Sequence, residues 1–171
     1  MAFRHGVTGN ESPTRLIAAV SDGITPVYVG TAPINLCEKQ YINEPMLCSS
    51  YAEAVEYFGY SDDFKNYTLC EAIDTHFSKF NIGPIVLINV LDPSKHRKEI
   101  SNKSISQING MYLLEDTGII VDTVVIISSF EHTKKFNEKG QLLLIPKEEK
   151  SGAIQVSYST LDPSAIKAKE I

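Results

Sequence analysis

Residues 83–96 read GPIVLINVLDPSKH, and this stretch decides what kind of fold the chain has. An apolar, mostly β-branched run from Ile85 to Val90 ends in a group of polar side chains. These are Asn89, Asp92, Ser94, Lys95 and His96. A nearly continuous apolar run predicts a strand that is covered on both faces. Functional groups of open α/β sheets lie just beyond the carboxyl ends of strands, so the polar group is either an active site or a structural turn.

A strand and a short helix are predicted upstream. Residues 26–34, PVYVGTAPI, are rich in Val and Tyr and close on a Thr-Ala-Pro turn, which indicates a strand. Residues 49–59, SSYAEAVEYFG, predict a helix that begins at Ser49 or Ser50 and stops at Gly59.

A second helix is predicted from Thr68 to Phe80, with Thr68 and Glu71 as its capping box. The order strand, helix, helix, strand predicts a parallel α/β unit. Because a sheet usually has about five or six strands, a lone parallel pair looks unfinished. We therefore expect other chains or further sequence to complete this sheet.

The character of the sequence changes after His96, where short β-rich runs are separated by Gly and polar turns. The predicted fold class is α/β, with an incomplete sheet, plus a small all-β inserted domain, after an extended N-terminal arm. The predicted divisions are an arm at 1–24, an α/β portion at 25–96, a β-rich domain at 97–160 and a return linker at 161–171.

Composition excludes several classes of protein. The chain is 43% hydrophobic and 22% charged, which is typical of a globular protein. A net charge of -5 argues against nucleic-acid binding, which depends on Lys and Arg contacts to phosphates. No apolar run reaches the roughly 18 to 20 residues that span a bilayer, and the N-terminus lacks the apolar stretch of a secretory signal. Synthesis in the cytoplasm is the expectation.

No catalytic, cofactor-binding or metal site is predicted. The three cysteines form no CxxC pair, and the four histidines have no HxH or HxxxH spacing. Neither a phosphate-binding loop nor a GxSxG motif occurs.

The polar group after Val90 has two interpretations. Asp92, Lys95 and His96 could perform acid/base chemistry in a cleft at the end of the strand. Alternatively, Asp-Pro-Ser is a turn, in which the Asp accepts main-chain hydrogen bonds and the Pro fixes φ, and residues 95–98 are a solvated linker. A second copy of the motif at the other end of the β zone favours the turn. The predicted domain-boundary turns are Asp92, Pro93 and Ser94, and Asp162, Pro163 and Ser164.

Several segments, taken in order, resemble contractile tail sheath proteins of bacteriophages and phage-tail-like particles. They are HGVTGNESPT (5–14), GITPVYVGTAPINL (23–36), FGYSDDFKNYTLCEAIDTHF (58–77), GPIVLINVLDPSKH (83–96), KGQLLLIP (139–146) and IQVSYSTLDPSAI (154–166). No single motif is diagnostic, and the resemblance lies in the ordered set. Sheath proteins of this kind are longer, so the resemblance implies that these residues are an N-terminal portion or a short relative.

The resemblance implies a mechanical function without catalysis or cofactors. Sheath subunits stack as rings around a tail tube, and extended arms add strands to sheets of neighbouring subunits. Contraction then drives the tube through an envelope. The implied partners are other sheath subunits, the tube protein and the baseplate, with no nucleic-acid or membrane contact, in a tail assembled after synthesis in a host cytoplasm. The apolar piece RLIAAV would be the inter-subunit arm, with Arg15, Leu16, Ile17 and Val20 as its key residues.

Two other functions remain open. One is a small α/β ligand-binding or enzymatic domain that uses the end of strand 85–90; it requires Asp92 or His96 to have a perturbed pKa in a concave pocket. The sheath interpretation predicts an exposed turn there. The other is an adhesion or receptor-binding module, which requires an exposed apolar or aromatic patch on residues 97–160.

Overall fold

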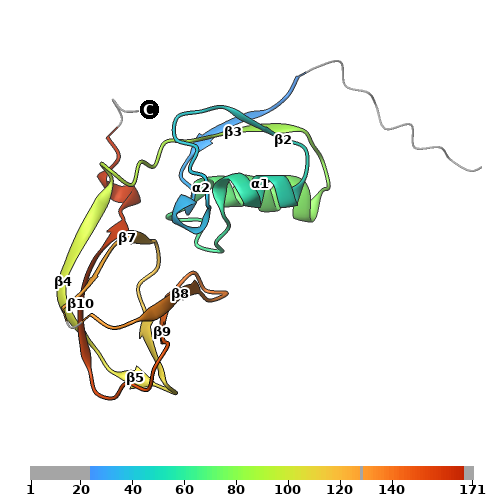
Figure 1. Ribbon diagram of the computed structural model, residues 1–171. Coiled ribbons are helices and arrows are strands. Elements are labelled where there is room, and N and C mark those ends of the chain that lie inside the picture. Colours follow the sequence, from blue (N-terminus) through green and yellow to red (C-terminus); the bar gives the residue numbers. More distant parts are fainter. Residues whose placement is uncertain (1–23, 128, 168–171) are drawn as a thin grey trace, which may run out of the picture.

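The computed structural model describes residues 24–127 and 129–167, which form two lobes (Figure 1). One lobe is a mixed α/β unit, and the other is built from antiparallel β-sheets. The predicted fold class is therefore confirmed at this level. The predicted arm residues Arg15, Leu16, Ile17 and Val20 lie outside the described residues.

The α/β lobe contains a three-stranded sheet in the order β1-β3-β2. Its strands are β1 (Val27–Gly30), β2 (Met46–Cys48) and β3 (Ile85–Asn89). The predicted parallel pair is confirmed, since Val27 lies beside Val86 in a parallel ladder. The antiparallel strand β2 was not predicted.

The two predicted helices are present. They are α1 (Tyr51–Phe58) and α2 (Thr68–Ile73), the second continuing as a π-helical segment η2 (Asp74–Lys79). Ser50 caps α1 by accepting a hydrogen bond from the Glu53 amide at 3.3 Å, and Gly59 ends it with a φ of 72°. A short 3-10 helix, η1 (Ile34–Leu36), follows β1.

The capping box predicted for the second helix is wrong. Thr68 is the first residue of α2 rather than its cap, and α2 has no side-chain cap. The Thr68 hydroxyl instead accepts a hydrogen bond from the Thr31 amide at 3.1 Å. A tertiary contact to the end of β1 therefore replaces the local one.

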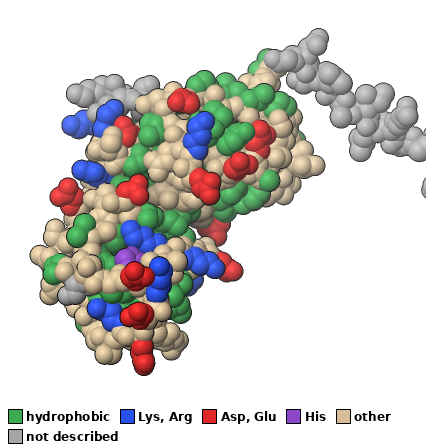
Figure 2. Space-filling view, in the orientation of Figure 1, with side chains coloured by type: hydrophobic (Ala, Val, Ile, Leu, Met, Phe, Trp, Pro, Cys, Tyr) green, Lys and Arg blue, Asp and Glu red, His purple; other side chains and the backbone are tan. Residues whose placement is uncertain are grey.

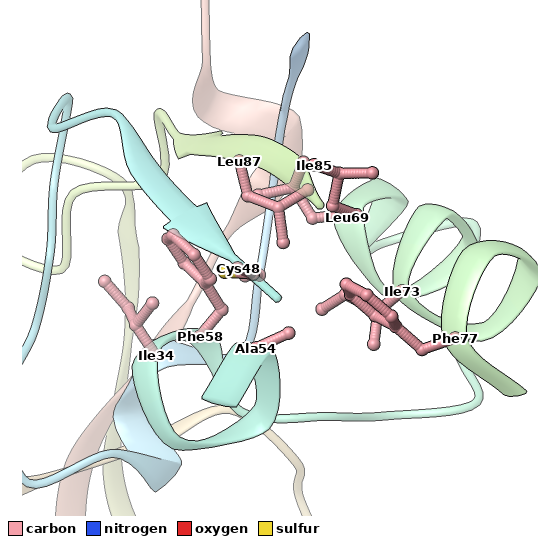
Figure 3. Close-up of a cluster of buried hydrophobic side chains, with 10 residues drawn as sticks. Ile34, Cys48, Ala54, Phe58, Leu69, Ile73, Phe77, Ile85 and Leu87 are labelled. Carbon is pink, nitrogen blue, oxygen red and sulfur yellow. The ribbon is translucent and has the colours of Figure 1, made fainter. Parts of the chain in front are cut away.

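The helices pack on one face of the sheet, and side chains from the helices and from this face together form the core of the lobe (Figure 3). The labelled core residues are Ile34, Cys48, Ala54, Phe58, Leu69, Ile73, Phe77, Ile85 and Leu87.

The other face of the sheet is uncovered by any described residue. Val27 and Leu47 both lie beside Val86, and Val29 lies beside Ile88, so these five apolar side chains share one face. Val27, Val29 and Leu47 are 58%, 51% and 54% exposed. We call these five residues the open face. The prediction that the strand is covered on both faces is wrong for the part of the chain described.

The β lobe holds two antiparallel sheets, in the orders β4-β10-β7 and β5-β6-β9-β8. The first contains β4 (Arg97–Ile105), β7 (Ile119–Ile126) and β10 (Ile154–Leu161). The second contains β5 (Gln107–Ile108), β6 (Met111–Leu114), β8 (His132–Phe136) and β9 (Leu142–Pro146). Both sheets contribute to one core, which includes Tyr112, Leu114, Ile119, Leu142, Leu144 and Val156. A final 3-10 helix, η3 (Pro163–Ala165), follows β10.

Candidate functional site

The carboxyl end of β3 is organised by a buried amide, Asn89, which is fully inaccessible to solvent. Its Oδ1 accepts hydrogen bonds from the amides of Ala32 and Leu91, both at 3.1 Å. Its Nδ2 donates to the carbonyl of Leu91 at 3.1 Å. One side chain therefore ties the end of β3 to the end of β1, and it satisfies main-chain groups that would otherwise be buried unpaired.

Asp92 forms the predicted turn. Its Oδ1 accepts hydrogen bonds from the Ser94 amide at 2.9 Å and from the Ser94 hydroxyl at 2.6 Å. Burial acts to raise the pKa of Asp92, but the hydrogen bonds from Ser94 and the nearby Lys95 ammonium outweigh it and hold the pKa below its ordinary value. A carboxyl group with a lowered pKa stays ionised at neutral pH, which suits a turn and not a general acid.

His96 is packed into the structure. It is 5% exposed, and its Nδ1 accepts a hydrogen bond from the Asp92 amide at 3.0 Å. The predicted solvated linker at 95–98 is therefore partly wrong, because His96 is buried and both Arg97 and Lys98 belong to β4. The predicted exposed turn is also only partly correct: Ser94 and Lys95 are exposed, whereas Pro93 is buried.

The second Asp-Pro-Ser motif repeats the first. The Asp162 Oδ1 accepts hydrogen bonds from the Ser164 amide at 3.1 Å and from the Ser164 hydroxyl at 2.5 Å. The two turns lie side by side, because the Asp162 amide donates to the His96 carbonyl at 2.9 Å. The chain thus enters and leaves the β lobe at one place.

Apolar packing joins the lobes at the same place. Leu91 and Leu161 pack with Tyr67 and Cys70 of the α/β lobe, and all four side chains are buried. Asn35 adds a hydrogen bond from its Nδ2 to the Ile119 carbonyl at 3.2 Å, although its buried Oδ1 has no partner among the described residues.

A hollow of about 390 Å³ lies between the lobes. Its lining includes Asn35, Tyr60, Asp62, Tyr67, Gly118 and Lys139, but neither Asp92 nor His96. An acid/base site at the end of β3 would depend on Asp92 and His96, and neither residue lines this hollow.

The three thiols are unsuited to nucleophilic chemistry. Burial raises the pKa of Cys37 to about 11, with a further contribution from Cys70, and burial raises the pKa of Cys70 to about 11 and that of Cys48 to about 12. A reactive cysteine needs a lowered pKa, because the thiolate is the nucleophile.

These thiols predict a loss of stability in alkali. Above pH 9 the unfolded chain releases thiol protons that the folded chain retains up to about pH 11, so ionisation favours unfolding. We expect the free energy of unfolding, measured by urea titration in reducing buffer, to fall between pH 9 and pH 11. The fall should be smaller in Cys70→Ala, and an equal fall in both chains would refute this account.

The β lobe contains one charged cluster that sequence reasoning missed. The Lys103 Nζ lies 2.7 Å from the Asp116 Oδ2, which also accepts a hydrogen bond from the Tyr158 hydroxyl. Burial and this hydrogen bond raise the pKa of Tyr158 to about 12. Burial acts to raise the pKa of Asp116, but Lys103 and Tyr158 outweigh it and lower it. The three groups satisfy one another, which is typical of a structural ion pair.

Among residues 24–127 and 129–167, no three His, Cys, Asp or Glu side chains gather in a way that could hold a metal ion. None of the helices described is long and apolar enough to cross a membrane. On the face shown in Figure 2, positive and negative side chains are interspersed over the β lobe, without a continuous basic field.

Comparison with family models, with curated proteins and with solved structures gave no match.

Proposed function

We propose that this chain is a structural subunit of a contractile tail sheath, which assembles as stacked rings around a tail tube and contracts to drive that tube through an envelope. The observation that carries the proposal is the open face. Three exposed aliphatic side chains, Val27, Val29 and Leu47, lie together on a sheet whose opposite face is well packed. Contiguous exposed apolar surface indicates contact with another polypeptide.

The parallel ladder of β1 and β3 strengthens this argument. Sheets built wholly from parallel strands are almost always covered on both faces, and β1 and β3 form such a parallel pair within this mixed sheet. Among the residues that the structure describes, this sheet has three strands, and neither β1 nor β2 pairs along its outer edge. A sheet with two unpaired edges and one uncovered face fits a subunit that is completed on assembly.

The connection between the lobes also fits a mechanical part. Two adjacent turns and the packing of Leu91 and Leu161 fix the β lobe to the α/β lobe. In a sheath, the β lobe would be the protruding domain that moves with its subunit as rings rotate and slide.

The proposed partners are other sheath subunits, the tube protein and the baseplate, in the tail of a virion or phage-tail-like particle assembled in a host cytoplasm.

The proposal predicts that residues 1–20 are needed for assembly. Cells that produce the particle with these residues deleted should contain tubes without ordered sheaths, as scored by electron microscopy. Lys147→Ser, a change at an exposed side chain of the β lobe, is the control and should leave sheaths intact. Circular dichroism of the deleted protein checks that it still folds. Normal sheaths made by the deleted protein would show that the arm assignment is wrong.

A further inference from the structure

We propose that the hollow between the lobes binds a primary alkylammonium group, as carried by a diamine or a lysine side chain. Its volume of about 390 Å³ lies within the usual range of ligand pockets, which occur preferentially where two units of a fold meet. Asn35 and Tyr67 line it from the α/β lobe, and Gly118 and Glu138 line it from the β lobe. A ligand held there would contact both lobes. This binding site is independent of the assembly role proposed above.

The Tyr67 hydroxyl is a polar group that the protein leaves unpaired in this hollow. Tyr67 is 5% exposed and packs with Leu91 and Leu161 at the junction of the lobes. Its hydroxyl lies close to Gly118, where an added methyl group would be 2.8 Å from the hydroxyl oxygen. Within the described part of the chain, no group forms a hydrogen bond with this hydroxyl. Buried tyrosine hydroxyls usually have a partner, so this one is available to a ligand.

Asn35 supplies a second unpaired atom. It is 7% exposed, and its Nδ2 donates a hydrogen bond to the Ile119 carbonyl at 3.2 Å, which fixes the orientation of the side-chain amide. Its Oδ1 has no partner among the described residues. An amide oxygen only accepts hydrogen bonds, so a ligand that pairs with it must carry an N–H or O–H group.

Carboxylates determine the sign of the charge that the hollow favours. Among the described residues of its lining, Asp62, Asp63 and Glu138 carry negative charge and only Lys139 carries positive charge. Burial and the negative charge of Asp63 raise the pKa of Tyr67 to about 12. The Tyr67 hydroxyl therefore stays protonated at neutral pH, and the surrounding charge favours a positively charged ligand.

An alkylammonium group fits this lining better than a metal ion does. No three His, Cys, Asp or Glu side chains gather as metal ligands in the described residues. An ammonium group carries three N–H donors, which suit an unpaired amide oxygen, a hydroxyl and carboxylates. Tyr60 and Tyr67 also line the hollow, and tyrosine rings attract cations. Pro33 and Leu36 add apolar surface for the methylene chain.

The test is a titration of the full chain with butane-1,4-diamine, followed through its amide resonances by NMR. We expect saturable shifts centred on Asn35, Gly118 and Gly140, with a dissociation constant of about 1 mM or tighter. Butane-1,4-diol has the same chain without charge and should bind at least about tenfold more weakly, because hydrogen bonds from a charged donor are stronger.

A second probe, N-acetyl-lysine methylamide, distinguishes the two sources of the ammonium group. If it binds more tightly than the diamine, the natural occupant is a lysine side chain of another polypeptide. If it binds more weakly, the natural occupant is a free diamine.

Tyr67→Phe is the sharpest variant, because it removes only the unpaired hydroxyl. We expect it to keep or raise the free energy of unfolding in urea and to weaken diamine binding about threefold or more. Asp62→Asn should also weaken binding, and Lys139→Gln should tighten it, because the two changes alter the charge of the hollow in opposite directions. The matched control is Tyr112→Phe, whose lost hydroxyl donates to the Gly152 carbonyl at 2.9 Å, outside the hollow. It should lower stability and leave diamine binding unchanged.

Several results would overturn the site. Absence of saturable shifts with both amine probes would show that the hollow holds only solvent, and equal binding of the diamine and the diol would reject an ammonium ligand. Diamine binding by Tyr67→Phe as tight as by the original chain would also overturn it. If Tyr67→Phe fails to fold by circular dichroism, the changes at the exposed Asp62 and Lys139 decide, and unaltered binding in both would overturn the proposal.

Discussion

Replacing Asn89 by alanine should lower the free energy of unfolding by about 3 kcal/mol. The change removes the Oδ1 acceptor and leaves two buried main-chain amides without a hydrogen bond. Those amides belong to Ala32 and Leu91, and the Leu91 carbonyl loses its Nδ2 donor as well. Urea titration followed by circular dichroism measures the effect. Asn66→Ala is the control, because Asn66 is exposed and, within the described part of the chain, its side-chain amide bonds only to the Asp63 carboxylate. Equal effects in the two variants would show that Asn89 does not organise the end of β3.

The second large effect is expected at the junction of the lobes. Leu91 is fully buried between the lobes, so Leu91→Ala should leave a cavity and lower the free energy of unfolding by about 3 kcal/mol. Leu47→Ala makes the same chemical change at a side chain that is 54% exposed, and it should change stability by no more than about 0.5 kcal/mol.

The same urea titrations also report on the coupling of the lobes. If the packing around Leu91 and Leu161 joins the lobes into one cooperative unit, Leu91→Ala should shift the transition of both together. Similar costs for Leu91→Ala and Leu47→Ala would contradict the described junction.

Strong local signals in the sequence predicted the corresponding elements. The Ser50 cap and the Gly59 stop bracket α1, and the apolar run beginning at Ile85 is β3. The first Asp-Pro-Ser motif forms a turn at the entry to the β lobe, and the second opens the 3-10 helix η3 at the exit from it. The cap of α1 and the hydrogen bonds of the two Asp-Pro-Ser motifs join residues that are close in sequence, so the local pattern predicts them. Strand β3 pairs with distant strands, and it was predicted from its apolar run alone.

Elements fixed by distant partners were missed. Strand β8 reads HTKKF and shows no apolar alternation, and it forms because it pairs with β9. Strand β2 is only three residues long and sits in a polar loop, where pairing with β3 determines its conformation. Thr68 was predicted to cap its own helix, but its hydroxyl accepts a hydrogen bond from the amide of Thr31, 37 residues away.

The candidate site was predictable only in part. The polar group after Val90 drew attention to the correct place, and the turn interpretation of Asp92 agrees with its hydrogen bonds. The role of Asn89 was missed, because an amide at the end of an apolar run gives no sign of which main-chain groups it will meet. The open face could not be predicted either, since an apolar run looks the same whether one face or both faces are covered.

The measurement that tests the sheath proposal most directly is the location of this chain in particles. Gold-labelled antibodies raised against the 171-residue chain can be applied to particles from cells that produce it and viewed by negative-stain electron microscopy. The proposal predicts labels at regular intervals along the outside of contractile tails, in both extended and contracted forms. Particles whose tails carry no label, from preparations in which the chain is otherwise detected, would contradict it.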